Sequence, residues 1–262
     1  MPRKTKRPMW EFKQAAEPDT LEIYIYGDVE SDGYDWWWGE KIPSDTSADH
    51  FREELTKHPN AKEIKLYINS YGGDVFEGTA IYNQLRRHPA HKTVYVDGFA
   101  CSIASVIAMA GDKVVMPRNT MMMIHNMWMY AMGNAAELRK AADDLDTINA
   151  AGRQAYLQKA GDKLSEDKLI EMMDAETWLT AEDCIELGFA DEYAEEDADL
   201  SKAGGILELA NMNIQQRLEL QKNLAAQLKQ IFKPADKPEE NPKPTEKTNP
   251  VNSLIKVLGG NF

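Results

Sequence analysis

The stretch from Asp97 to Gly111 constrains the fold more than any other part of the chain. Its second part, Ala100–Ala110, is a run of small and apolar residues, which is typical of a helix covered on every side. Thr93–Val96 before it is β-branched and aromatic, which favours a strand, and Gly98 allows a tight turn. The sequence therefore predicts a strand that turns sharply into a buried helix.

Ser102 lies where this buried helix is expected to begin. The backbone N–H groups in the first turn of a helix have no intrahelical acceptor, and they stabilise negative charge. An oxyanion formed beside Ser102 would be stabilised there, so this serine is a candidate nucleophile. A serine at a helix start is also a common N-cap, and the stretch by itself leaves both interpretations open.

A second strand, turn and helix is expected earlier in the chain. The strand Ile64–Ile68 is followed by a turn over Asn69–Asp74 and by a helical stretch from Val75 to Arg87. The turn contains Gly72 and Gly73, but neither a dinucleotide-binding glycine pattern nor a P-loop lysine follows, which argues against a nucleotide site. A glycine pair also lets backbone N–H groups approach a bound carbonyl closely. The pair serves either the turn alone or a site of this kind.

His125 stands out among the five histidines of the chain. Lys113–Met116 and Thr120–Ile124 are typical of short strands, and the second of them leads directly into His125. This position suits a general base, which must be held rigidly and have a pKa near the working pH. A structural role is the alternative. The other histidines lie at polar helix ends: His50, His58, His88 and His91.

Composition limits the function classes. With 262 residues, 43% of them hydrophobic, the chain can bury one substantial core and still carry a tail. A formal net charge of −13 argues against nucleic-acid binding, because phosphate contacts need clustered basic residues. The only such cluster in the sequence is at the N-terminus and consists of Arg3, Lys4, Lys6 and Arg7. Cys101 and Cys184 make no disulfide framework, and we expect Cys101 to be a small core residue. No apolar run suits a signal peptide or a membrane span, so we expect a cytoplasmic protein.

The chain divides into four segments. Residues 1–19 are expected to be a flexible N-terminal arm, and residues 20–195 the folded domain. Residues 196–232 are expected to be an acidic connector followed by an amphipathic helix over Asn213–Phe232, which needs a partner because free helices of this length are marginal. Residues 233–262 are expected to be a disordered tail rich in Pro, Lys and Glu.

Two apolar segments within the folded domain call for a partner surface. Trp36, Trp37 and Trp38 would either line a peptide groove or cover the edge of a sheet, and we favour the second because aromatic clusters more often pack. Met127–Gly133 is apolar and leads into a long helix, Ala135–Ala160, which favours a contact between subunits.

Four motifs taken together resemble the Clp-type serine peptidases, the ClpP family, in order and spacing from about Leu21 to Glu192. They are Asn69-Ser70-x-Gly72-Gly73, Gly98-x-Ala100-x-Ser102, Met123-Ile124-His125, and Thr180-Ala181-Glu182 with Leu187-Gly188-Phe189-Ala190-Asp191. Asp35-Trp-Trp-Trp-Gly39 and Glu176-Thr-Trp178, with the long C-terminal extension, look most like the ClpP-related head maturation (prohead) proteases of tailed phages.

The resemblance implies an α/β fold, the ClpP/crotonase-like arrangement of repeated ββα turns, with subunits assembled into rings. Carried over by position, Ser102 matches the nucleophile and His125 the general base. The N–H groups of Gly73 and Ile103 match the oxyanion hole. Met127–Ala160 matches the handle through which two rings meet, which implies a stacked double ring.

The chain departs from the family pattern at two places. Tyr71 stands where the family has a proline before the glycine pair. The third member of the triad is normally an aspartate two residues before an aromatic residue, and this chain has Glu176 at that position. Glu176 is therefore the expected acid, and Asp174 is the alternative.

We expect a serine endopeptidase with ATP-independent chemistry that cleaves scaffold or capsid precursors during phage capsid assembly, in the host cytoplasm and within the prohead. One alternative is a cytoplasmic Clp-like peptidase in general protein degradation. Another is a scaffolding or assembly protein with little activity. No cofactor or metal is implied, and neither nucleic acid nor membrane is expected as a partner.

Overall fold

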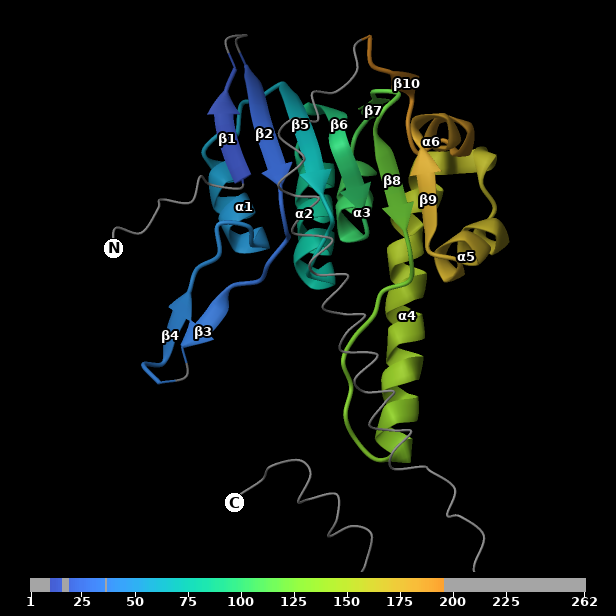
Figure 1. The fold of residues 1–262 in the computed structure, drawn as a ribbon. Coiled ribbons are helices and arrows are strands. Elements are labelled where there is room, and N and C mark those ends of the chain that lie inside the picture. The colour runs from blue at the N-terminus through green and yellow to red at the C-terminus, as the bar shows by residue number, and fades with distance from the viewer. Residues whose placement is uncertain (1–9, 16–18, 36, 196–262) are drawn as a thin grey trace, which may run out of the picture. The chain divides into compact units, whose positions relative to one another are not determined.

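The computed structural model describes residues 10–15, 19–35 and 37–195 (Figure 1). Within these residues eight strands form one sheet, namely β1 (Trp10–Gln14), β2 (Thr20–Tyr26), β5 (Glu63–Ser70), β6 (His91–Cys101), β7 (Lys113–Met116), β8 (Met121–Ile124), β9 (Thr177–Thr180) and β10 (Glu192–Tyr193). A separate hairpin consists of β3 (Gly33–Asp35) and β4 (Glu40–Ile42). The helices are α1 (Ala48–Thr56), α2 (Val75–Arg87), α3 (Ile103–Ala108), α4 (Ala135–Ala160), α5 (Glu166–Asp174) and α6 (Ala181–Leu187).

The sheet forks at β6. Its order is β1-β2-β5-β6-β7-β10, and β8 and β9 form a branch that starts at β6. The first half of β6 pairs with β7 through Thr93–Tyr95, and the second half pairs with β8 through Phe99–Cys101. Strands β2, β5, β6, β7, β8 and β10 run parallel to one another, whereas β1 pairs antiparallel with β2 and β9 pairs antiparallel with β8. The carboxyl ends of β5, β6 and β8 therefore lie together, which is where open α/β sheets place their sites.

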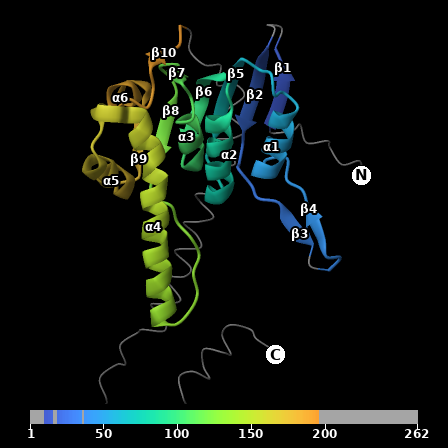
Figure 2. The same ribbon diagram turned by 180° about the vertical axis from the view of Figure 1, so that it is seen from behind.

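Helices α1, α2 and α3 cover one face of this sheet (Figure 2). The predicted α/β class is confirmed. The predicted bounds of α2 and α4 agree with the structure, since each helix begins after a capping side chain, Asp74 for α2 and Asn134 for α4. No described helix is both long and apolar enough to cross a membrane.

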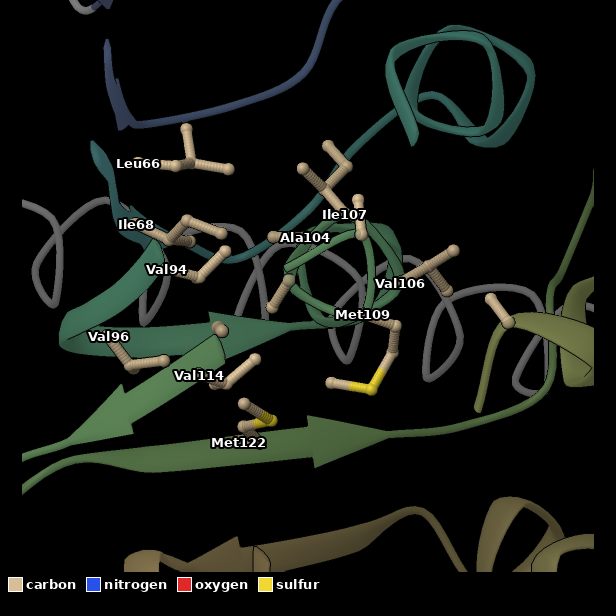
Figure 3. Close-up of a cluster of buried hydrophobic side chains, with 14 of the residues drawn as sticks. Leu66, Ile68, Val94, Val96, Ala104, Val106, Ile107, Met109, Val114 and Met122 are labelled. Carbon is tan, nitrogen blue, oxygen red and sulfur yellow. The ribbon is translucent and has the colours of Figure 1, made fainter. Parts of the chain in front are cut away.

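Helix α3 lies at the centre of the core, and all six of its residues are buried, as the apolar run predicts. Figure 3 shows its side chains packed among those of β5, β6, β7 and β8. The helix is shorter than Ala100–Ala110, because β6 continues as a strand through Cys101.

The prediction of a tight turn at Gly98 is wrong, because this glycine lies inside β6. A Cβ at Gly98 would lie 2.7 Å from Asn69 Oδ1. That amide oxygen accepts a hydrogen bond from the Phe99 N–H at 3.3 Å. The register between β5 and β6 shifts between Ile68 and Ser70, so the glycine permits the close approach of Asn69 at this irregularity.

The expectation of a flexible arm over residues 1–19 is wrong for residues 10–14, which form β1 and pair antiparallel with β2. Trp10 is 3% exposed, and its ring meets Phe51 of α1 edge-on. Phe12, two residues later, contacts the same ring. Two aromatic residues at this spacing bury one face of a strand, a pattern that the charged composition of the segment concealed.

The hairpin of β3 and β4 leaves the sheet after β2 and projects on the side where the parallel strands end (Figure 1). Trp37 and Trp38 lie at its turn and are 89% and 76% exposed. The Asp35 carboxylate accepts hydrogen bonds from the N–H groups of both residues, at 2.8 and 3.1 Å, which fixes the turn. The expectation that the tryptophans cover a sheet edge is therefore wrong for these two; Trp36 lies outside the described residues.

The segment Met127–Gly133 forms no strand, and its apolar side chains are largely exposed next to α4. The predicted domain boundary at residue 195 stays a prediction, because residues 196–262 lie outside the described residues. The expected connector and helix of residues 196–232 and the expected tail of residues 233–262 lie outside them.

Candidate active site

Ser102 joins the end of β6 to the start of α3. Its N–H donates a hydrogen bond to the Met123 carbonyl of β8 at 2.8 Å. Its backbone has φ +54° and ψ −130°, a conformation that residues with a Cβ rarely adopt. The Ser102 side chain makes no capping hydrogen bond to α3, which removes the N-cap interpretation. A strained serine at the carboxyl end of a parallel strand is a candidate site residue on structural grounds alone.

The Ser102 hydroxyl faces His125. Oγ of Ser102 lies 2.8 Å from Nε2 of His125, within the distance over which an imidazole can take a hydroxyl proton. The strands explain this proximity, because Cys101 at the end of β6 is paired with Met123 near the end of β8. The structure thus brings together the two residues that the sequence singled out, although they are 23 positions apart.

The turn that follows β5 packs directly against Ser102. A Cβ at Gly72 would lie 2.8 Å from Ser102 Cβ and 3.1 Å from the Ile103 nitrogen. A Cβ at Gly73 would lie 2.0 Å from the Val29 carbonyl oxygen. The two glycines have φ values of +100° and +145°, so both positions need glycine for backbone conformation as well as for space.

Val29 holds the glycine turn in place, a role that the sequence does not predict. Its N–H donates to the Gly72 carbonyl and its carbonyl accepts from the Asp74 N–H, both at 2.8 Å. This parallel bridge is made by the residues on either side of Gly73, so it does not use the N–H of Gly73 itself. The Ile103 N–H lies in the first turn of α3, where donors have no intrahelical acceptor. Nothing in the local sequence marks Val29 except that it follows the end of β2.

Glu176 immediately precedes β9, and His125 immediately follows β8. Strand β9 runs antiparallel to β8, and Thr177 opposite Ile124 is the last pair of the ladder, so Glu176 and His125 are the first residues beyond it. The Glu176 side chain is exposed, and its backbone has φ +51°, which turns the chain between α5 and β9. This is a second position of backbone strain at the same end of the sheet.

Asp174, the alternative acid, is the last residue of α5. Its Oδ1 accepts a hydrogen bond from Nδ2 of Asn126 at 2.6 Å, and Asn126 follows His125 directly. Asp174 is therefore engaged by the neighbour of His125. The sequence does not predict Asn126 as the partner of this carboxylate, because the contact depends on how the end of α5 lies relative to the end of β8.

Two other reactive side chains near Ser102 are structural. Ser105 is buried, and its Oγ donates to the Ser102 carbonyl oxygen at 2.6 Å. Cys101 is also buried, and burial raises the pKa of its thiol to about 12. The thiol stays protonated at neutral pH, which confirms that Cys101 is a core residue and not a reactive cysteine.

Tyr71, the residue before the glycine pair, packs its ring against the neighbouring strand. Its ring stacks on Phe99 of β6 with centroids 5.7 Å apart, and Phe99 meets Trp178 of β9 edge-on at 6.3 Å. Partial burial raises the pKa of the Tyr71 hydroxyl to about 12. Packing of the Tyr71 ring on Phe99 thus restrains the glycine turn against β6.

In the described part of the chain, no three His, Cys, Asp or Glu side chains are grouped so that they could hold a metal ion. The chemistry that the described geometry can perform is proton transfer between Ser102 and His125, beside backbone N–H groups that can face an oxyanion.

Known proteins resemble part of this chain. The family described as Clp protease matches residues 40–197. The ATP-dependent Clp protease proteolytic subunit of Deinococcus radiodurans is 31% identical over 138 residues, which cover 52% of this chain and 66% of that protein. The ATP-dependent Clp protease proteolytic subunit 3 of Streptomyces coelicolor is 30% identical over 144 residues, 54% of this chain and 65% of that protein. The chain thus spans slightly less than two thirds of the length of these relatives.

Proposed function

The chain belongs to the Clp protease family, and we propose that it is a serine endopeptidase in which Ser102 is the nucleophile and His125 the general base. The observation that carries this proposal is the 2.8 Å distance between Ser102 Oγ and His125 Nε2 at a strained strand-to-helix turn. Because the chain spans slightly less than two thirds of the length of its relatives, the peptidase activity of the whole protein is also a proposal.

In the proposed reaction, His125 Nε2 takes the hydroxyl proton while Ser102 Oγ attacks the carbonyl carbon of a peptide bond. The N–H groups of Gly73 and Ile103 donate to the resulting oxyanion. His125 then gives the proton to the leaving amine, which leaves an acyl group on Ser102. His125 takes a proton from a water molecule, whose oxygen attacks the acyl carbon, and then gives that proton to Ser102 Oγ as the acyl–Oγ bond breaks and the acid product leaves. Glu176 is proposed to orient the imidazole throughout.

A fluorophosphonate probe for active serines tests this function. The probe should label the purified chain, and mass spectrometry of the digested product should place the label on Ser102, because the nearby base activates that hydroxyl. The same preparation should hydrolyse a short unstructured fluorogenic peptide. Label found on Ser105 would redirect the assignment, and a folded protein that neither reacts nor hydrolyses peptide would favour a scaffolding role.

We also propose that the chain works as a ring of identical subunits, and that two rings stack. The family resemblance implies this arrangement, and exposed apolar side chains on Met127–Gly133 support it. Tyr130 and Met132 are 73% and 96% exposed, as expected for side chains that another copy covers.

Capsid maturation is the biological role that we propose, with scaffold or capsid precursors as substrates. Its support is the likeness of Asp35–Gly39 and Glu176–Trp178 to the head maturation proteases of tailed phages. General protein degradation is the second candidate, and the two relatives favour it because both are named as proteolytic subunits of ATP-dependent Clp proteases.

Removal of residues from about Ala210 onward separates these two roles. Ring formation and cleavage of a small peptide should not change, because the proposed site lies before residue 196. Processing of capsid precursors and entry into proheads should fall sharply if the tail raises the local concentration of capsid or scaffold protein. A truncated enzyme that processes precursors at the normal rate would contradict targeting by the tail. Loss of ring assembly would show that the removed segment belongs to the subunit interface.

A further inference from the structure

One face of α4 contacts the chain on both sides of the Ser102–His125 pair. The face consists of Asn149, Gly152 and Tyr156, whose spacing places them along one side of a helix. Asn149 and Tyr156 are 7% and 2% exposed, and Asn149 is the first buried residue along α4. A buried polar residue in the middle of a largely exposed helix needs a reason, and the contacts of this face supply one.

On the His125 side, the face of α4 anchors Met127. The Met127 N–H donates to Asn149 Oδ1 at 2.8 Å. The Met127 side chain lies against Gly152, where a Cβ would come within 2.2 Å of the Met127 Cε. The chain leaves β8 at Ile124, so His125 is held between the sheet on one side and this anchor two residues later on the other.

On the Ser102 side, the same face reaches the peptide unit that follows the nucleophile. Oη of Tyr156 lies 2.7 Å from Ser105 Oγ, and Ser105 Oγ donates to the Ser102 carbonyl oxygen at 2.6 Å. Burial raises the pKa of the Tyr156 hydroxyl, so it stays protonated and can donate to Ser105. The Ser102 carbonyl and the Ile103 N–H belong to one planar peptide, so a bond that fixes the oxygen also fixes the direction of the N–H.

We propose that Asn149 and Tyr156 are positioning residues, and that α4 sets the geometry of the site from both ends. Asn149 acts through Met127 on His125, and Tyr156 acts through Ser105 on the peptide that supplies the Ile103 N–H. Neither side chain contacts the reacting atoms. This inference rests on the proposed peptidase function and adds to it the residues that hold the base and one oxyanion donor in register.

Substitution of Asn149 tests the base side. Asn149→Leu keeps the size of the side chain but removes the acceptor, and a displacement of about 1 Å at the base lowers turnover about 10²-fold. We expect kcat to fall by about this factor with KM nearly unchanged, because substrate contacts remain. Asn149→Asp keeps an oxygen acceptor for the Met127 N–H and should restore most of kcat. Gln154→Ala changes an exposed residue of the same helix and is the matched control, with wild-type kcat expected.

Tyr156→Phe tests the oxyanion side with the loss of a single oxygen atom. It should also lower kcat more than KM, and circular dichroism and thermal unfolding would show that the variant is folded. This variant carries the test alone if Asn149→Leu does not fold. Wild-type kcat in folded Asn149→Leu and Tyr156→Phe would overturn the proposal, as would failure of Asn149→Asp to recover activity lost in Asn149→Leu.

Nitrogen NMR of histidine-labelled protein separates this inference from the proposed function. The His125 ring signals are assigned by their loss in His125→Gln. They should shift in Asn149→Leu and return in Asn149→Asp. The reason is that the difference in chemical shift between the two ring nitrogens depends on the contact with Ser102. If the wild type neither reacts with the probe nor cleaves peptide, the proposed function fails, and a shifted His125 signal still supports positioning by Asn149. An unchanged His125 signal in Asn149→Leu overturns positioning whether or not the protein is a peptidase.

Discussion

Replacement of Ser102 by glycine should abolish peptide hydrolysis and still give a protein more stable than the Ser102→Ala variant. Loss of a triad nucleophile lowers kcat by on the order of 10⁶, so both variants should turn over at background. Their stabilities should differ because Ser102 has φ +54° and ψ −130°. A residue with a Cβ is strained there by on the order of 1 kcal/mol or more, and only glycine relieves that strain.

Thermal unfolding and peptide hydrolysis of the two variants, measured side by side, check this result. Ala151→Gly, at an exposed position of α4, is the control. It should lower the free energy of unfolding, because glycine in the middle of a helix is less stable than alanine by roughly 0.5–1 kcal/mol. A Ser102→Ala variant more stable than Ser102→Gly would contradict the assigned strain. Hydrolysis above background by either variant would show that Ser102 is not the nucleophile. A more stable Ser102→Gly variant would show that the wild-type turn is less stable than it could be because it carries the Ser102 hydroxyl.

The sequence predicts those elements whose signals are local. Helix α4 begins after Asn134, whose side chain accepts from backbone N–H groups in the first turn while Glu137 completes a capping box. Helix α6 begins in the same way at Thr180 and ends at Gly188, which has the left-handed conformation expected of a terminating glycine. Caps of this kind act within one helical turn, so they can be read from neighbouring residues alone.

The errors arise where a distant segment decides the local conformation. Gly98 is typical of a turn in its own sequence, but Asn69 from the neighbouring strand needs the space that its missing side chain leaves. Trp37 and Trp38 have the composition of a packed cluster, but the hairpin carries them away from the sheet. Neither outcome follows from periodicity, because each depends on the placement of a whole strand or hairpin.

The proposed site shows the same division. The order of the motifs predicts that Ser102 and His125 meet, and the structure brings them within hydrogen-bond distance. The residues that support them were not predicted: Val29 fixes the glycine turn, and Asn126 engages Asp174. Each of these contacts joins segments that are far apart in the sequence, and the separation is different for each contact. No pattern of residue spacing can therefore predict them.

Substitution of the proposed acid should have the second largest effect. Glu176→Gln keeps the shape of the side chain but removes the charge, and a triad with an amide in place of its carboxylate favours the wrong imidazole tautomer. We expect kcat to fall by on the order of 10⁴ while thermal unfolding and the sedimentation behaviour of the assembly stay as in the wild type. Glu176→Asp should retain more activity than Glu176→Gln, because it keeps a carboxylate, although a shorter one.

Asp174→Asn is the matched control, since it neutralises the other carboxylate at the same end of β9. The Asp174 carboxylate already accepts a hydrogen bond from Asn126, whereas Glu176 directly precedes Thr177, the residue paired with Ile124 at the end of the β8–β9 ladder. Asp174→Asn should therefore lower kcat far less, through a weaker hold on Asn126 alone. The reverse result, a large loss in Asp174→Asn with an active Glu176→Gln, would make Asp174 the acid. Asn126 would then compete with His125 for that carboxylate, and Asn126→Ala should raise activity instead of lowering it.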